Sequence, residues 1–79
     1  MSNVNFIVIY RDCGNTCDGL CRVLESTETF QDAQAEMTRD VNSYLLENPN
    51  TRLDVDEESH RIVVDAAGED TCVWQILSL

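Results

Sequence analysis

The chain opens with a run of β-branched and aromatic residues, 4–10, that leads into a stretch typical of a turn. That stretch, 12–19, contains Gly14, Asn15 and Gly19. Residues 20–25 then fall into two alternating sets of side chains, as on the two faces of a β-strand. A strand-like run that enters a turn-rich segment and is followed by a second run predicts a β-hairpin. We therefore expect strands over 4–10 and 20–25, joined by a long loop.

The middle of the chain carries one apolar stripe with the period of an α-helix. Its members recur at spacings of three and four and are Phe30, Ala33, Met37, Val41, Tyr44 and Leu45. Thr29 followed three residues later by Asp32 is typical of a helix N-cap. Asn48-Pro49 ends the pattern, because a residue before proline avoids the α region. We predict a helix that begins near Phe30, ends at Asn48-Pro49 and lies on a sheet through its apolar stripe.

Three further strands are expected after the helix. Leu53 and Val55 alternate with acidic residues, and polar residues 57–60 form a turn into the strand-like run 61–66. A second turn, 67–70, precedes the final run 71–77, in which Cys72, Trp74 and Ile76 share one face. The predicted order is ββαβββ. It indicates one α+β domain over residues 1–79, with a largely antiparallel sheet whose one face is covered by the helix and whose other face is partly wet.

The charge of the chain restricts the classes of partner that it can bind. Fifteen Asp and Glu residues face five Arg residues and no Lys, for a formal net charge of −10. Such a field repels nucleic-acid phosphates and anionic membranes and attracts basic surfaces. The N-terminal apolar run is also too short for a signal segment or a membrane span. We expect a cytoplasmic protein that binds neither nucleic acid nor membrane directly, although a high net charge also serves solubility alone.

The four cysteines do not match a metal-binding pattern. Cys13, Cys17 and Cys21 are spaced by three residues and Cys72 lies far away, whereas structural zinc sites pair their cysteines two to four residues apart in each of two knuckles. We expect no metal and no cofactor. Cys21 and Cys72 are interpreted as buried strand residues, and Cys13 and Cys17 as loop thiols able to oxidise to each other.

No catalytic residue stands out, and we expect a protein that is not an enzyme. The single histidine, His60, lies in an expected turn among acidic residues, with nothing to position it as a base. A calcium loop starting at Asp54 would need glycine and glutamate where Ser59 and Asp65 stand.

The acidic residues are more informative in their arrangement than in their number. Asp32, Glu36 and Asp40 recur at i, i+4 and i+8 of the expected helix, with Glu47 close to the same line. A second set follows the helix: Asp54, Asp56, Glu57 and Glu58. Each like-charge i,i+4 pair costs about 0.2–0.5 kcal/mol. The two sets are interpreted either as a solvated face or as an imitation of a phosphate backbone that occupies a basic groove.

Three functional hypotheses follow from these patterns. The favoured one is a non-enzymatic protein that uses all eight residues to bind a basic surface of a nucleic-acid-handling partner; on it, reversing Asp32, Glu36 and Asp40 to Lys should leave the fold intact. The second is a homodimer that buries Trp74 or neighbouring apolar residues of the open sheet face. The third is a redox or metal-responsive protein working through Cys13, Cys17 and Cys21.

Several features of the layout resemble a group of small proteins. These are the helix start Thr29-x-x-Asp-Ala-x-x-Glu-Met37, the Asn48-Pro49 stop and the final strand Cys72-Val-Trp-Gln-Ile76. The layout resembles small uncharacterised acidic proteins of bacteria, phages and mobile elements. Size and charge are similar to those of phage anti-CRISPR and anti-restriction proteins, several of which mimic DNA. The resemblance implies an inhibitor of a nucleic-acid-handling enzyme, and it assigns no role to any single residue.

Overall fold

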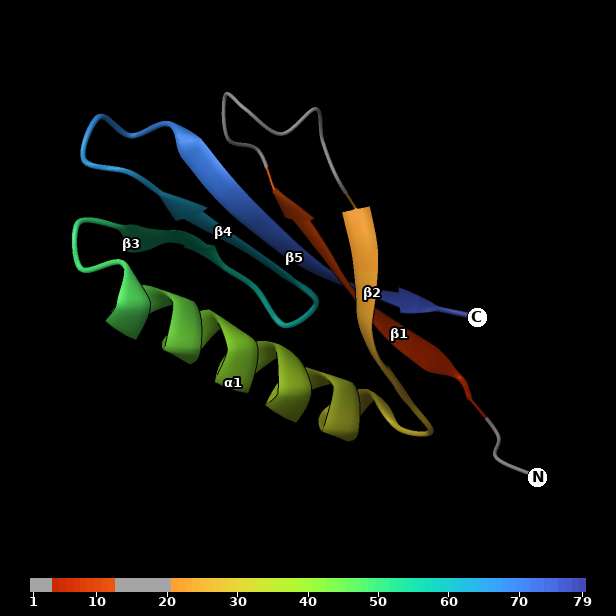
Figure 1. Cartoon of the computed structure of the whole chain (residues 1–79). Helices are drawn as coiled ribbons and strands as arrows, with labels where there is room; N and C mark the ends of the chain where they lie inside the picture. The colour runs from red at the N-terminus through yellow and green to blue at the C-terminus, as the bar shows by residue number, and fades with distance from the viewer. Residues whose placement is uncertain (1–3, 13–20) are drawn as a thin grey trace.

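The predicted order of elements is confirmed by the computed structural model, which describes residues 4–12 and 21–79 (Figure 1). The described chain forms five strands and one helix. They are β1 (Phe6–Asp12), β2 (Cys21–Thr27), α1 (Phe30–Glu47), β3 (Arg52–Asp56), β4 (His60–Val64) and β5 (Asp70–Ser78). The expected loop 12–19, with Cys13 and Cys17, falls outside the described residues except for its first residue.

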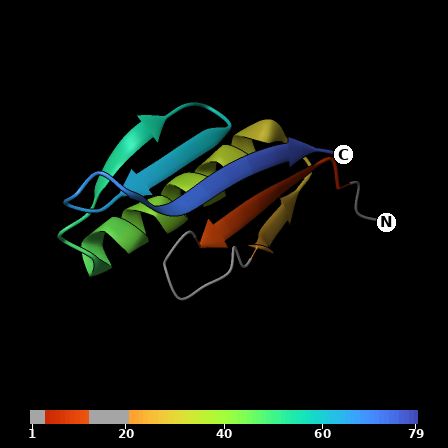
Figure 2. The same cartoon turned by 90° about the horizontal axis from the view of Figure 1, so that it is seen from above.

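The strands form one antiparallel sheet in the order β2-β1-β5-β4-β3. The last strand, β5, is central and joins the N-terminal hairpin to the β3–β4 hairpin. The helix α1 connects the two edge strands, β2 and β3, so it must cross the whole sheet. Figure 2 shows α1 running diagonally across one face, behind the strands. The α+β architecture with one helix on one face is therefore confirmed.

Local signals at both ends explain the bounds of α1. Thr29 has an extended backbone, and its hydroxyl accepts a hydrogen bond from the Asp32 amide at 3.1 Å, which satisfies one of the free N–H groups of the first turn. At the other end, the backbone amide and the side-chain amide of Asn48 both donate to the Tyr44 carbonyl oxygen at 2.9 Å. The N-cap and the stop before Pro49 are thus both confirmed.

The core lies between α1 and the sheet, with Trp74 at its centre. Trp74 is fully buried and meets the rings of Tyr10 and Tyr44 edge-on, at centroid distances of 5.3 and 5.5 Å. Cys72, Trp74 and Ile76 all belong to this core, as the strand alternation predicts. The expectation that Trp74 contributes to a dimer through the open sheet face is wrong, because the helix covers its side of β5.

The open face of the sheet is more apolar than expected. Strand alternation places Ile7, Ile9 and Ile62 there as half-buried residues, and Val73 there with 5% exposure.

The strand β4 ends earlier than expected, at Val64 rather than at residue 66. The Asp65 carboxylate explains this early end, because it accepts hydrogen bonds from the amides of Ala67 and Glu69 and so closes a turn.

Candidate functional site

The eight acidic residues of the favoured hypothesis lie on opposite flanks of α1. Successive helix residues are rotated by about 100°, so Asp40 and Thr38 are about 160° apart around the axis. Asp40 contacts Trp74 in β5, whereas Thr38 contacts Arg61 in β4. We call the residues on the first flank the helix set, namely Asp32, Glu36, Asp40 and Glu47. The residues beyond the second flank are the turn set, namely Asp54, Asp56, Glu57 and Glu58.

The two sets do not form one continuous surface. The solvent-facing ridge between the flanks begins with the exposed Asp32, which lies about 20° from Arg39 around the axis. Beyond that first turn the ridge carries Ala35, Arg39, Asn42 and Leu46, none of which is acidic. The interpretation of all eight residues as a single acidic face therefore needs correction. Among the described residues, the helix set and the turn set are thus separate acidic surfaces, divided by a ridge that is neutral or basic from Ala35 to Leu46.

Asp40 of the helix set has a structural role. The indole Nε1 of Trp74 donates a hydrogen bond to Asp40 Oδ2 at 2.6 Å. A buried indole N–H requires a partner, because an unmet donor away from water is destabilising. The premise that Asp40 faces away from the core is wrong, because its carboxylate accepts this hydrogen bond. We therefore expect reversal of Asp40 to Lys to destabilise the fold, since the change removes the acceptor.

The other members of the helix set differ in their surroundings. Glu36 is 32% exposed and forms an ion pair with Arg39 at 3.3 Å. Asp32 is exposed in the first turn, where the helix dipole favours a negative charge. Glu47 is the last residue of α1, and no basic residue stands in that last turn. Its carboxylate there is unfavourable by about 0.3–1 kcal/mol. Within this set, Asp32 and Glu47 are the carboxylates most accessible to a partner.

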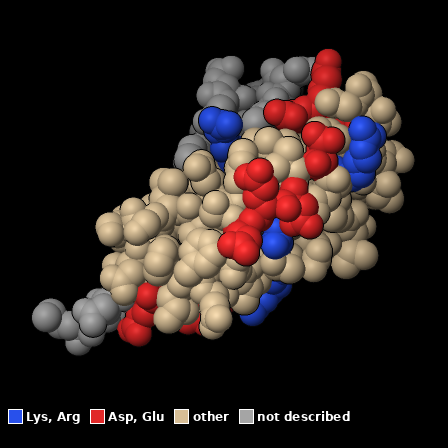
Figure 3. All heavy atoms as spheres, turned by 180° about the vertical axis from the view of Figure 1, so that it is seen from behind, with Lys and Arg blue, Asp and Glu red and all other residues tan. Residues whose placement is uncertain are grey.

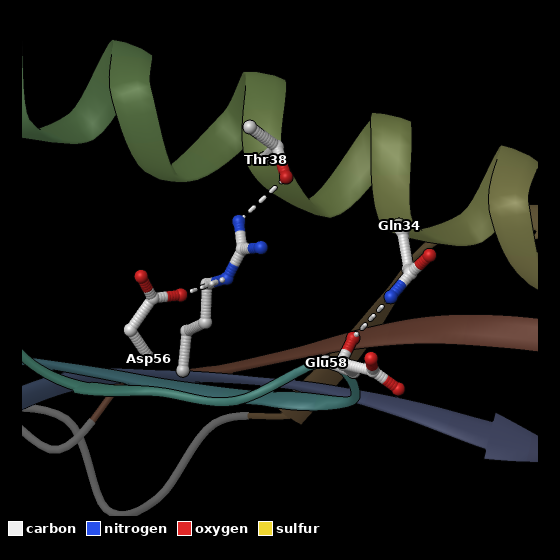
Figure 4. Close-up of polar contacts among 5 residues, drawn as sticks. Gln34, Thr38, Asp56 and Glu58 are labelled. Carbon is white, nitrogen blue, oxygen red and sulfur yellow. Dashed lines mark hydrogen bonds and ion pairs between the residues drawn. The ribbon is translucent and has the colours of Figure 1, made fainter.

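The turn set is attached to the helix by a polar bridge (Figure 4). Arg61 Nη1 donates to Thr38 Oγ1 at 2.6 Å, and Arg61 Nε lies 3.0 Å from Asp56 Oδ1. The contact between Arg61 Nε and Asp56 Oδ1 is an ion pair and not a hydrogen bond, because the Nε–H group has no hydrogen-bond acceptor among the described residues. Nearby, the Gln34 side-chain amide donates to the Glu58 carbonyl oxygen at 3.3 Å. These contacts fix the β3–β4 turn against α1 while its carboxylates face solvent.

All four side chains of the turn set are exposed. They belong to the edge strand β3 and to the turn after it. Figure 3, the view from behind Figure 1, shows Asp and Glu side chains gathered across the middle and upper part of that face, with Arg side chains beside them. Among the described side chains, the ion pairs are Glu36–Arg39 and Asp56–Arg61. Asp54, Glu57 and Glu58 thus form no ion pair with any of the described arginines.

The described residues also place the other candidate side chains. His60 is the first residue of β4 rather than a turn residue, and it is half-buried. Cys72 is buried as expected, with its sulfur 3.1 Å from the Tyr10 hydroxyl. No group of three or more potential metal ligands occurs in residues 4–12 and 21–79. The side chains of Cys13, Cys17 and Cys21 lie outside the described part of the chain.

A pocket of about 220 Å³ lies beside the Asp40–Trp74 hydrogen bond. It is lined by Tyr10, Asp40, Ser43, Tyr44, Glu47 and Trp74. Helical spacing predicts that Asp40, Ser43 and Glu47 share one side of α1. No signal in the sequence pairs that side with Tyr10 and Trp74, because the pairing depends on which strands lie beneath it.

The chain has an α+β fold with one helix across an antiparallel sheet, and its exposed acidic residues are the candidate site. No family model, curated protein or solved structure matches the chain. Within the described residues, α1 is not long and apolar enough to cross a membrane.

Proposed function

We propose that this chain is a non-enzymatic binding protein whose acidic surface engages a basic, nucleic-acid-binding surface of a partner protein. Inhibition of a CRISPR or restriction enzyme by DNA mimicry is the most specific form of this proposal. The observation that carries it is the exposed turn set, in which three carboxylates have no cationic partner among the described side chains. Asp32 and Glu47 supply a second, separate acidic contact on the far flank of α1.

Local charge of this kind favours encounter with a basic groove. Uncompensated carboxylates on a fixed edge strand create a potential that steers a cationic partner and raises the association rate. Interactions between exposed charges are screened beyond about 10 Å at 0.1 M salt. Binding through the turn set should therefore weaken steeply as salt rises.

The test is affinity capture from a lysate at low and high salt, with the bound proteins identified by mass spectrometry. The wild-type chain is compared with a variant in which Asp54, Glu57 and Glu58 are changed to Asn, Gln and Gln. A matched control neutralises three exposed carboxylates elsewhere, Glu25, Glu28 and Glu69. Salt-sensitive capture of a nuclease or CRISPR subunit, lost in the first variant and kept in the control, supports the proposal. Equal loss of capture in both variants would show that capture depends on the net charge of the chain and not on the turn set.

Self-association through the open sheet face is the second candidate function. Two apolar side chains on that face are well exposed, Val23 at 56% and Leu77 at 37%. Two copies with a formal charge of −10 each repel one another, so added salt should strengthen the dimer, whereas it should weaken binding to a basic partner. Sedimentation at several protein and salt concentrations separates the two functions by the sign of the salt effect.

A further inference from the structure

The pocket beside Trp74 combines carboxylates with aromatic rings. On the helix side, Asp40 and Glu47 are separated by about two turns, with the Ser43 hydroxyl between them. Tyr10 and Tyr44 line the pocket with Trp74, and both rings are half-buried. Hydrogen-bond acceptors and aromatic rings that line one hollow are the groups that recognise an organic cation.

The aromatic part of the pocket is fixed in position. Tyr10 and Tyr44 both pack edge-on against Trp74, with interplanar angles of 62° and 72°. Trp74 is itself fully buried and held by Asp40. A cation that enters would meet preorganised rings, so little side-chain freedom is lost on binding.

The two carboxylates retain capacity for a ligand. A carboxylate offers about four acceptor positions, and the Trp74 indole uses one of those on Asp40. Glu47 stands at the helix terminus where its charge is least favourable, with no basic residue in that turn to offset it. Glu47 is therefore an exposed carboxylate of the pocket lining that a cation in the pocket can reach.

We propose that this pocket receives the guanidinium group of an arginine side chain of the partner. The proposal rests on the proposed function, because a basic nucleic-acid-binding surface supplies exposed arginines. The pocket volume of about 220 Å³ lies below the roughly 300–1,000 Å³ of sites for drug-sized ligands, which suits a single side chain. A planar guanidinium both stacks on aromatic faces and donates five hydrogen bonds, so it matches rings and separated acceptors better than an ammonium group does.

The single tryptophan of the chain provides a specific probe. The Trp74 indole N–H resonance is followed by NMR during titration with N-acetyl-arginine amide. Blocked citrulline is the neutral isostere of this probe, and blocked lysine tests the ammonium group. We expect a saturable shift with arginine, a weaker response to lysine and none with citrulline. Glu47→Gln should weaken arginine binding about three- to fivefold, in line with the loss of one exposed charge pair.

Glu28→Gln is the matched control, because it removes the same charge from an exposed residue at the other end of α1, outside both acidic sets, and should leave the titration unchanged. The absence of a saturable shift with arginine, or equal responses to arginine and citrulline, would overturn the pocket proposal. So would an equal effect of the Glu47 and Glu28 variants. Such a failure is distinguishable from failure of the proposed function, because capture through the turn set would still be salt-sensitive and still lost in the turn-set variant.

Discussion

The acidic sets on the two sides of α1 have four carboxylates each but use them differently. On the flank facing β5, Asp40 is bound to the buried Trp74 indole, and Glu36 forms an ion pair with Arg39. On the flank facing β4, the neutral Thr38 makes the contact to Arg61, and the turn-set acids beyond it face solvent. The role of a carboxylate is thus decided by what the sheet places opposite it, and not by its position in a charged row.

This difference separates stability from binding. Loss of a carboxylate that satisfies a buried donor destabilises the fold, whereas loss of an exposed and unpaired carboxylate changes stability little. Substitutions on the two flanks should therefore give opposite results in unfolding and binding experiments.

The largest effect is expected from Asp40→Lys. The substitution leaves the Trp74 N–H without an acceptor and places an ammonium group in a half-buried position, so the free energy of unfolding should fall by about 3 kcal/mol. Asp40→Asn keeps an acceptor oxygen and should cost less than about 1 kcal/mol. Urea denaturation followed by circular dichroism measures both values. Equal losses in the two variants would show that charge, and not the hydrogen bond to Trp74, is what Asp40 contributes.

The polar bridge of the other flank should have a smaller effect. Arg61→Met removes the bond to Thr38 and the ion pair with Asp56, and we expect a loss of about 1–2 kcal/mol in the free energy of unfolding. Arg52 provides the control, because it is an exposed arginine on the neighbouring strand β3. If Arg52→Met destabilises the protein as much as Arg61→Met, the bridge contributes nothing specific.

Much of the fold could be predicted because its signals are local. The apolar stripe, the Thr29 cap and the Asn48-Pro49 stop each act within a few residues, and together they define α1. Alternation along β5 correctly places Cys72 and Trp74 on one face. It does not tell which of the two faces the helix covers, and this is why Trp74 was expected on the open face.

The candidate site depends on contacts between distant segments. Asp40 and Trp74 are 34 residues apart, and Thr38 and Arg61 are 23 apart. Both contacts follow from the sheet order, in which β5 inserts between β1 and β4. Helical periodicity aligned Asp40 with Asp32 and Glu36 correctly. It could not show that a buried indole lies opposite only one of them.

Glu47→Gln should stabilise the protein slightly. Removal of a negative charge from the last helical turn relieves an unfavourable interaction with the helix dipole, which is worth about 0.3–0.5 kcal/mol at an exposed site. The same substitution should weaken arginine binding in the pocket. Thermal unfolding beside the NMR titration tests both effects on one variant. A loss of stability would mean that Glu47 makes a structural contact, and its placement would then need no ligand.

Neutralising Asp54, Glu57 and Glu58 together should change stability least and binding most. The three side chains are exposed and bind no described arginine, so each substitution should stay within about 0.5 kcal/mol. Reduced repulsion on an acidic surface acts in the stabilising direction. Capture of a basic partner should nevertheless fall, and its remaining salt dependence should be shallower. A variant that unfolds more easily would show that the turn carboxylates stabilise the β3–β4 hairpin, and the contrast between the two flanks would then disappear.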